Sequence, residues 1–340
     1  PCLETNGLDG DNAMSEMNTL STESFVLKEV SGRVGCITLN RPKALNALSL
    51  SMVRDLTKAL LEFQNNPQVL AVLVRGHGKE SPFGHFCAGG DIRFFHQAAL
   101  GGDTSLADFF TEEYALNHLI HTYSKPYIAF MDGVVMGGGM GLSQGASLRI
   151  VTENTRMAMP ETNIGFFPDV GGGYFLSRCP GHAGEYLALT GEVIGADEAL
   201  QFGLADIKLE AAALPALWNA LASQHFANRA DVESWLALHA GQADPAQVQP
   251  NTKIDGFFSL LRVKHMVDAL EKAKDDRWAQ KTAKVLRKRS PLMLHVALEQ
   301  IRRARQMSLA DDLRMERDMV HHCFYDRPGT ASESVEIGRA

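Results

Sequence analysis

The stretch "KPYIAFMDGVVMGGGMGLS" (residues 125–143) decides the fold. Its first part, 126–133, is a short apolar run, which is typical of a strand buried on both faces. The glycines of "MGGGMG" (136–141) follow, and a helix-like segment comes after them. A buried strand that runs into a glycine loop and then into a helix predicts an α/β unit.

The same order of elements occurs on both sides of this stretch. Upstream, "VLAVLVRG" (69–76) predicts a buried strand, "FCAGGDI" (86–92) a glycine-bearing loop, and the residues up to 122 helices. Downstream, "LRIVTE" (148–153) predicts a third strand, which leads into "PETNIGFFPDVGGG" (160–173). The repetition of strand, glycine loop and helix indicates an α/β fold with largely parallel strands.

The first elements of the chain are predicted to be a hairpin and an amphipathic helix. Two β-rich runs around a Ser-Gly turn predict the hairpin in "FVLKEVSGRVGCITLN" (25–40). Apolar residues at helical spacing predict a helix over 49–66, with Ser49 or Ser51 as its N-cap.

The C-terminal third differs from the rest, because it shows no strand pattern from about residue 210 onward. Helical periodicity is present in three segments, 212–226, 256–290 and 291–325. We therefore expect three parts: a disordered or vector-derived N-terminal segment (1–21), an α/β core (22–210) and a helical C-terminal region (211–340).

The composition indicates an ordinary globular protein, with 45% hydrophobic and 21% charged residues. The net charge of −7 argues against a general nucleic-acid binder. The longest weakly charged stretch, 126–148, contains an aspartate and six glycines, which does not suit a membrane-spanning helix. The five cysteines form no CxxC pair and no histidine group matches a metal signature, so we expect neither a disulfide framework nor a metal site.

The first twenty residues carry four acids and no Lys or Arg, unlike a signal or transit peptide. We expect a cytoplasmic protein. If the source is eukaryotic and a transit peptide has been removed, we expect a protein of the mitochondrial matrix instead.

The glycine clusters fit no nucleotide-binding motif, because neither GxGxxG nor GxxxxGK[ST] is present in the required context. Residues 141–145 match GxSxG, the nucleophile elbow, around Ser143, but the preceding strand ends near Gly133, too far upstream. Two uses of the glycines remain. They make tight turns, or two loop N–H groups point at one carbonyl oxygen and form an oxyanion hole.

The stretch "PETNIGFFPDVGGG" holds two carboxylates, Glu161 and Asp169, with no Lys or Arg between them. Glu161 is either the first-turn acid of a helix that begins at Pro160 or a catalytic carboxylate. Asp169 is the N-cap of the next helix, the partner of Glu161, or both. If the two lie close together without a cation, the pKa of one is raised, which suits an acid/base pair.

Four motifs, in this order, resemble the crotonase (enoyl-CoA hydratase/isomerase) superfamily. They are "ITLNRPKALNALS" (37–49), "FCAGGDI" (86–92), "KPYIAFMDGVVMGGGMGLS" (125–143) and "MPETNIGFFPDVGGGYFLSR" (159–178). The resemblance covers about residues 25–205. It implies a crotonase-like spiral of repeated ββα units with an all-helical C-terminal region.

Within the superfamily the chain most resembles the 3-hydroxyisobutyryl-CoA hydrolases. Their signature carries an aspartate after the proline, as in "PETNIGFFPDVGG", and "TEEY" (111–114) is also similar. Hydratases have a catalytic glutamate where this chain has Gly141. The resemblance implies hydrolysis of a small β-hydroxyacyl-CoA in valine breakdown. It implies no cofactor, because coenzyme A is part of the substrate.

Two alternatives stay open: an enoyl-CoA hydratase or isomerase on the same fold, and a non-catalytic acyl-CoA-binding protein. The oligomeric state is also open. Members of the superfamily form trimers or hexamers, but a large helical C-terminal part can replace such contacts.

The resemblance also implies roles for individual residues. The N–H groups of Gly90 and Gly138 form the oxyanion hole. Glu161 attacks the thioester carbonyl or acts as general base on water. Asp169 binds the β-hydroxyl, orients Glu161 or passes a proton to the leaving thiolate. The further substrate-binding residues are Glu113, Lys43, Ala44, Leu45, Ala88 and Asp91.

Overall fold

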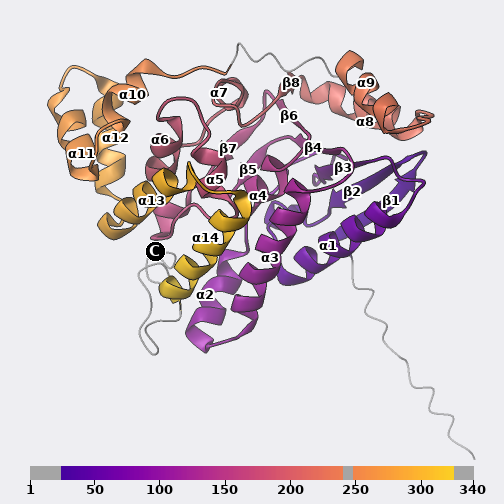
Figure 1. Cartoon of the computed structure of the whole chain (residues 1–340), viewed down its shortest axis with the longest axis horizontal. Coiled ribbons are helices and arrows are strands. Elements are labelled where there is room, and N and C mark those ends of the chain that lie inside the picture. Colours follow the sequence, from indigo (N-terminus) through magenta and orange to yellow (C-terminus); the bar gives the residue numbers. More distant parts are fainter. Residues whose placement is uncertain (1–23, 240–247, 325–340) are drawn as a thin grey trace, which may run out of the picture.

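The structure is a computed structural model that describes residues 24–239 and 248–324 (Figure 1). The N-terminal segment expected at residues 1–21 therefore lies outside the described residues. The strands are β1 (Val26–Ser31), β2 (Val34–Leu39), β3 (Ala71–Gly76), β4 (Tyr127–Met131), β5 (Val134–Met136), β6 (Leu148–Thr152), β7 (Arg156–Ala158) and β8 (Ile207–Leu209). Six of them form one sheet in the order β1-β2-β3-β4-β6-β8, and β5 pairs with β7 in a second sheet.

The helices divide into those of the α/β part and those that follow β8. The first group is α1 (Leu50–Asn65), α2 (Ile92–Gly101), α3 (Ser105–His121), α4 (Gly138–Gln144), α5 (Gly172–Leu176), α6 (Ala183–Thr190) and α7 (Ala196–Gln201). The second is α8 (Leu214–Ser223), α9 (Arg229–His239), α10 (Thr252–Phe258), α11 (Val263–Lys272), α12 (Arg277–Arg287), α13 (Pro291–Ala304) and α14 (Leu309–Phe324). Short 3-10 helices are η1 (Pro42–Ala44), η2 (Glu161–Ile164) and η3 (Ala211–Ala213).

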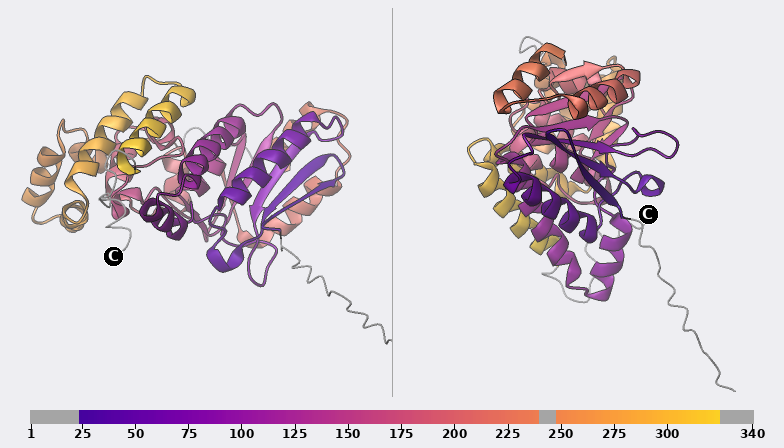
Figure 2. Two further views of the ribbon diagram at one scale, coloured as in Figure 1. Left: turned by 90° about the horizontal axis from the view of Figure 1, so that it is seen from below. Right: turned by 90° about the vertical axis from the view of Figure 1, so that its right-hand side faces the viewer.

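The large sheet is covered on both faces, which explains why its parallel strands read as continuous apolar runs. Alternate residues of β3 point to opposite faces, so Val72 and Leu73 belong to two different hydrophobic clusters. The larger cluster contains the buried side of α1, and the smaller one contains Trp218 of α8. The ribbon shows α1 and α8 on opposite sides of the sheet (Figures 1 and 2). Among the strands of the described residues, β1 and β2 alone pair antiparallel with each other, and their register confirms the predicted hairpin.

Two strands of the large sheet, β4 and β6, are each followed directly by a short strand of the second sheet. The sequence predicted one strand over 126–133, and that boundary was wrong, because β4 ends at Met131 and β5 begins at Val134. Gly133, with a φ of +59°, makes the turn between the two strands, and a side chain there would collide with His85. In the same way β6 is followed by β7. These strand–strand–helix units confirm the predicted fold class.

The helix predicted over 49–66 agrees with α1 to within one residue at each end. Ser49 caps α1 by accepting a hydrogen bond from the N–H of Met52, which decides between the two candidate serines. The described residues after β8 contain helices and no strand, as expected. The predicted segment 256–290 contains the end of α10 and all of α11 and α12, with Asp276 as the N-cap of α12. The segment 291–325 contains two helices, α13 and α14, and α9 lies outside the predicted segments. The limits of the three predicted parts stay a prediction.

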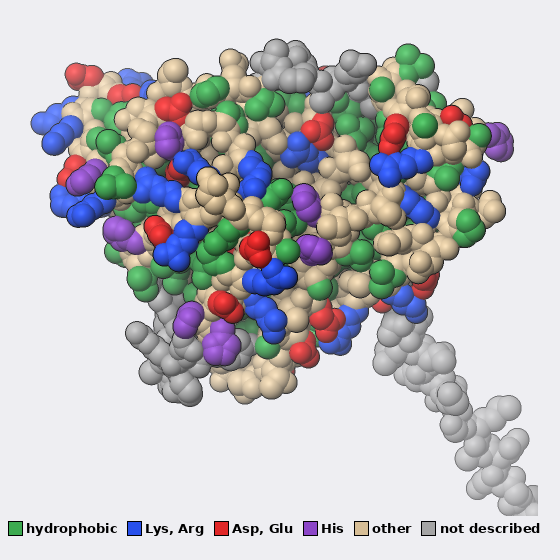
Figure 3. All heavy atoms as spheres, in the orientation of Figure 1, with side chains coloured by type: hydrophobic (Ala, Val, Ile, Leu, Met, Phe, Trp, Pro, Cys, Tyr) green, Lys and Arg blue, Asp and Glu red, His purple; other side chains and the backbone are tan. Residues whose placement is uncertain are grey.

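The surface carries acids and bases side by side over most of the face shown in Figure 3. One hollow beside α12 is lined mainly by basic side chains, which are Lys274, Arg277, Lys281, Lys284 and Lys288. Among the described residues, no helix has the length and apolar character needed to cross a membrane.

The C-terminal helix α14 holds the glycine loop that leads into α5. The buried carboxylate of Glu316 accepts hydrogen bonds from the N–H groups of Gly171 (2.8 Å) and Gly173 (3.0 Å). Gln300 of α13 donates to Glu316 (3.0 Å) and to the carbonyl oxygen of Pro168 (2.6 Å). Two helices of the C-terminal region therefore fix the backbone on both sides of residue 169.

A second buried acid lies one turn before Glu316. Asp312 accepts a hydrogen bond from the N–H of Tyr174 at 2.7 Å. Burial raises the pKa of Asp312 from 3.8 to about 6. Burial, followed by repulsion from Asp312 and Asp169, raises the pKa of Glu316 well above its usual range. The glycine loop is thus held by a pair of acids that favour the protonated state.

Replacement of Asp312 by asparagine should change how thermal stability depends on pH. The raised pKa of Asp312 contributes stability that is fully present below about pH 4 and is lost as the pH rises to about 6. Asparagine keeps an acceptor for Tyr174 and does not titrate. We expect the melting temperature of Asp312→Asn, relative to that of the wild type, to rise between about pH 4 and 6.5 in scanning calorimetry.

The neighbouring Asp311→Asn is the matched control. Asp311 is exposed, and hydrogen bonds from Ser308 and attraction to Arg314 lower its pKa. Its removal should therefore lower the relative melting temperature as the pH rises. The same trend in both variants would contradict the account of Asp312.

Candidate active site

Two glycine loops meet at the edge where β4 passes into β5. The N–H of Met136 donates to the carbonyl oxygen of Cys87 at 3.0 Å, which ties one loop to the other. A Cβ atom built on Gly89 would lie 3.1 Å from the carbonyl oxygen of Met136 and 3.5 Å from the nitrogen of Gly138. Gly138 is the first residue of α4, where a helix leaves its N–H without an intrahelical acceptor. Gly90 and Gly138 are therefore brought to one place.

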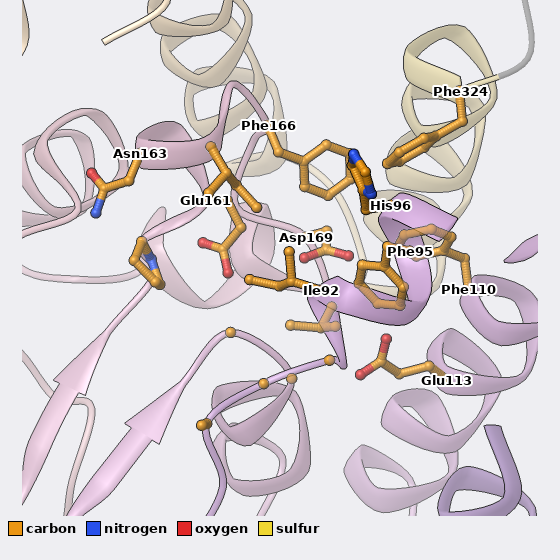
Figure 4. Close-up of a pocket in the computed structure, with 18 residues that line it drawn as sticks. Ile92, Phe95, His96, Phe110, Glu113, Glu161, Asn163, Phe166, Asp169 and Phe324 are labelled. Carbon is orange, nitrogen blue, oxygen red and sulfur yellow. The ribbon is translucent and has the colours of Figure 1, made fainter. Parts of the chain in front are cut away.

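A cavity of about 210 Å³ lies against these two loops (Figure 4). Its lining includes Gly90 and Gly138, three carboxylic acids, and aromatic side chains from α2, α3 and α14. The full lining is Ala88, Gly89, Gly90, Ile92, Phe95, His96, Phe110, Glu113, Gly137, Gly138, Pro160, Glu161, Asn163, Ile164, Phe166, Asp169, Val170 and Phe324. This lining is mostly apolar with a few convergent polar groups, as in sites for small ligands.

The three acids point into the same space, as Figure 4 shows. Glu113 is 2% exposed, Asp169 6% and Glu161 7%. A Cβ atom on Gly137 would lie 2.8 Å from Glu161 Oε1, and one on Gly138 would lie 2.5 Å from Glu113 Oε1. Only glycine leaves room for the two carboxyl groups beside this loop.

Two of these carboxyl groups have buried oxygens that make no hydrogen bond within the described structure. They are Oε1 of Glu113 and Oε2 of Glu161. Buried polar atoms usually have a partner, so such atoms are common where a ligand supplies it. The site is therefore prepared for a ligand that donates hydrogen bonds.

Burial dominates the electrostatics of the cavity. Desolvation, and then repulsion among the three acids, raises the pKa of Glu113 and of Glu161 well above the usual range. Desolvation also raises the pKa of Asp169 to about 7, although a 2.8 Å hydrogen bond from the Tyr114 hydroxyl opposes the shift. Groups that titrate near neutral pH are suited to proton transfer.

Six of the ten residues predicted for the site line this cavity. They are Ala88, Gly90, Glu113, Gly138, Glu161 and Asp169. Lys43 and Ala44 lie in η1, and Leu45 follows it with a φ of +51°. Leu45 accepts a hydrogen bond from the N–H of Ala88 at 3.0 Å, so this turn borders the first glycine loop.

Asp91 does not line the cavity. It caps α2 by accepting from the N–H of Phe94, and it forms an ion pair with Arg41 at 2.8 Å. A structural role accounts for both of its carboxylate oxygens. Its role in substrate binding stays a prediction.

The structure also decides between the alternative interpretations of the two carboxylates. Glu161 does begin a helix, the 3-10 helix η2, so its structural interpretation and its place in the cavity are compatible. Asp169 as an N-cap is wrong, because Glu316 and Asp312 accept the N–H groups at the start of α5. Asp169 is thereby available to Tyr114 and the cavity.

The nucleophile-elbow alternative is not supported. Ser143 lies inside α4, is fully buried and donates to the carbonyl oxygens of Gly139 (2.9 Å) and Met140 (3.3 Å). Gly141 lies one turn into the same helix, and a Cβ atom there would lie 2.7 Å from both Asn117 Nδ2 and Val170 Cβ. A glutamate has no room at position 141.

Sequence reasoning missed several residues of the cavity. Tyr114 stands beside Glu113 in "TEEY", but nothing in the sequence indicated that its hydroxyl reaches Asp169. The aromatic wall was also missed, because Phe110 stacks on Phe324, which is 214 positions away in the chain. Helical periodicity assigns both to a buried face without indicating that the face borders a cavity.

Comparisons with known proteins identify the family of the chain. A family model for enoyl-CoA hydratase/isomerase matches residues 34–336. The mitochondrial 3-hydroxyisobutyryl-CoA hydrolase of Xenopus tropicalis is 40% identical over 300 residues, which cover 86% of this chain and 77% of that protein. The 3-hydroxyisobutyryl-CoA hydrolase 1 of Arabidopsis thaliana is 38% identical over 310 residues, covering 89% and 81%.

Solved structures are similar as well. The one titled carnitinyl-CoA dehydratase from Mycobacterium thermoresistibile has a TM-score of 0.78 at 35% identity and covers 94% of this chain and 97% of its own. An enoyl-CoA hydratase from Rhodobacter sphaeroides has a TM-score of 0.75 at 35% identity, with coverage of 86% and 83%. These matches confirm the crotonase-like fold.

Replacement of Tyr114 by phenylalanine should raise the pKa of Asp169 above about 7, because the hydroxyl that stabilises the ionised carboxylate is lost. Titration of carbon-13-labelled aspartate side chains by NMR measures this directly. Tyr123→Phe is the control, since that hydroxyl donates to the carbonyl oxygen of Leu60. An unchanged Asp169 titration in Tyr114→Phe would show that the hydrogen bond does not control it.

Proposed function

This chain belongs to the enoyl-CoA hydratase/isomerase family, and from that premise we propose that it is a thioesterase acting on 3-hydroxyisobutyryl-CoA or a similar small β-hydroxyacyl-CoA. Several relatives that are 36–40% identical carry the name 3-hydroxyisobutyryl-CoA hydrolase. The observation that carries the proposal is the single cavity that joins Gly90, Gly138, Glu161, Asp169 and Glu113.

In the proposed reaction the thioester carbonyl oxygen accepts hydrogen bonds from the N–H groups of Gly90 and Gly138. One such donor contributes roughly 3–4 kcal/mol to stabilisation of the tetrahedral transition state. Glu161 either attacks the carbonyl carbon, giving an anhydride that water then hydrolyses, or removes a proton from the attacking water. Both routes consume one water and release the acid and free CoA.

Asp169 completes the proposed machinery. A carboxyl group with a pKa of about 7 can deliver a proton to the leaving thiolate and regain it in the same cycle. Tyr114 holds the side chain in place through its hydroxyl. Glu113 is placed to accept a hydrogen bond from the β-hydroxyl of the acyl group, because its Oε1 is buried and has no other partner.

The cavity limits which acyl groups fit. A volume of about 210 Å³ takes a short acyl group and not the whole of CoA. We place the remainder of CoA along Lys43, Ala44, Leu45, Ala88 and Asp91, which border the first glycine loop. The lining described by the structure contains three acids and no Lys or Arg, so an acyl group that carries its own carboxylate is disfavoured. No cofactor beyond the substrate is proposed.

The alternative, an enoyl-CoA hydratase or isomerase on the same fold, is favoured by the names of two similar solved structures. Addition of water across a double bond needs a second glutamate at the position of Gly141. Asn117 and Val170 occupy the space that its side chain would enter. We therefore place this function second.

The oligomeric state and the cellular location are expectations of the same proposal. Relatives from animals are named mitochondrial, which fits the matrix option for a eukaryotic source. For a source that is not eukaryotic, a cytoplasmic location is proposed. Light scattering tests whether the chain forms a homo-oligomer.

Replacement of Glu161 by glutamine should reduce the release of free thiol from 3-hydroxyisobutyryl-CoA by at least about a thousandfold, because an amide neither attacks nor accepts a proton. Ser143→Ala should retain activity within about tenfold, since its hydroxyl is bonded inside α4 and does not line the cavity. Thiol release is followed spectrophotometrically, with circular dichroism as the check on folding. Loss of activity in Ser143→Ala with full activity in Glu161→Gln would overturn the proposal.

A further inference from the structure

In the described structure, the acyl cavity has more carboxyl oxygens that lack a hydrogen bond than one hydroxyl group can donate to. Glu113 and Glu161 are each more than nine-tenths buried and line the cavity, and each carries a buried oxygen without a hydrogen-bond partner among residues 24–239 and 248–324. Asp169 adds a third carboxyl group, and only one of its oxygens is bonded to Tyr114. A hydroxyl offers a single O–H donor, so it leaves at least one of these oxygens without a partner.

The position of these acids relative to the substrate follows from the glycine loop. Glu161 lies against Gly137 and Glu113 against Gly138, whose N–H is assigned to the thioester carbonyl oxygen. The two acids therefore flank the peptide that receives the carbonyl group. The β-carbon of an acyl chain is two bonds from the carbonyl carbon, so a polar group on it lies within reach of these carboxyl groups.

We propose that the same site also hydrolyses small β-aminoacyl-CoA thioesters, with the protonated amine of the substrate bound between Glu113 and Asp169. This activity rests on the proposed thioesterase function. An ammonium group is close in size to a hydroxyl, so the cavity that admits one admits the other. It offers three donors instead of one, and its charge compensates the acids.

The balance of charge favours this substrate class over others of equal size. Hydrogen bonds between an ammonium and a carboxylate are roughly twice as strong as those between neutral groups. The desolvation of the ammonium opposes binding, and it is offset only where several acids surround the cation. The described cavity meets that condition, because three acids line it and no Lys or Arg does.

The chemical step is the same as for the hydroxyl substrate. The oxygen of water forms a bond to the carbonyl carbon and the carbon–sulfur bond breaks. The thiolate takes up one proton, and the other proton of water is released from the new carboxylic acid. The amine keeps its protons and is not consumed, so no further reactant is needed.

The bound cation also changes the titration of the site. The groups that face it are Glu113 of α3, His96 of α2, Glu161 of η2 and Asp169. Behind Asp169 lie Tyr114, which donates to it, and Glu316 of α14. A positive charge stabilises the ionised form of each acid and lowers its pKa. The acidic limb of the pH–rate profile should therefore lie at lower pH for an amino substrate than for a hydroxyl substrate.

The test compares four CoA thioesters with the same three-carbon spacing to the terminal group: 3-hydroxypropionyl, 3-aminopropionyl, butyryl and malonyl. We expect kcat/KM for the amino substrate within about tenfold of that for the hydroxyl substrate, and at least about a hundredfold above butyryl-CoA, which lacks a donor. Malonyl-CoA should be the poorest. A 3-aminopropionyl-CoA that is no better than butyryl-CoA overturns the inference. If 3-hydroxypropionyl-CoA also reacts no faster than butyryl-CoA, the thioesterase proposal itself fails.

A variant separates charge compensation from simple fit. In Glu113→Gln the neutral amide cannot balance the ammonium, so kcat/KM should fall at least about tenfold more for the amino substrate than for the hydroxyl substrate. Glu112→Gln is the matched control, because the adjacent Glu112 pairs with Arg54 outside the cavity and should leave the ratio unchanged. Equal losses for the two substrates in Glu113→Gln contradict the proposed amine site.

Discussion

The placement of three carboxyl groups in one cavity without a lysine or arginine is the constraint on which the site depends. Burial and mutual repulsion raise the pKa values of Glu113 and Glu161, so each holds its proton more readily than a surface acid. Burial raises the pKa of Asp169 to about 7, and the hydrogen bond from the hydroxyl of Tyr114 limits that rise. The glycines at 137 and 138 give the acids room, and a side chain at either position would displace a carboxyl group.

Two more acids are buried behind the cavity, and there backbone N–H groups stabilise them. Glu316 and Asp312 are also buried acids, and they are stabilised by N–H groups of the glycine loop that follows Asp169. The α14 helix that carries them also supplies Phe324 to the cavity wall. The C-terminal helices are therefore part of the site, since the loop that bears Asp169 is fixed from α13 and α14.

Much of this arrangement follows from local sequence signals. Two β-rich runs on either side of a glycine-containing turn predict the first hairpin, and Ser49 begins α1 as its N-cap. For the glycine loops and Glu161, residue types alone left a structural and a functional interpretation open, and the resemblance to the crotonase superfamily assigned their roles. These signals act over a few residues, so they can be recognised without knowledge of the tertiary structure.

The remaining features depend on contacts between distant segments, which no local pattern encodes. Asp169 has the sequence signature of an N-cap, yet an acid 147 positions later, Glu316, takes that role. The turn at Gly133 divides an apolar run that looks continuous, because the second sheet is defined by pairing with β7. Phe324 lines the cavity through its contact with Phe110, which is also distant in the sequence. Of the predicted site residues, Gly90, Gly138 and the three acids of the cavity lie together. Lys43 lies in the turn that borders the first glycine loop, and Asp91 forms an ion pair with Arg41.

The most direct test of the account is a crystal structure with an analogue of 3-hydroxyisobutyryl-CoA in which a methylene group replaces the thioester sulfur. The resulting ketone cannot be hydrolysed at that bond. We predict that its carbonyl oxygen lies about 2.7–3.1 Å from the nitrogens of both Gly90 and Gly138, with Glu161 beside the carbonyl carbon. A carbonyl group bound away from both nitrogens would contradict the central claim that the glycine loops and the carboxyl groups form one catalytic site.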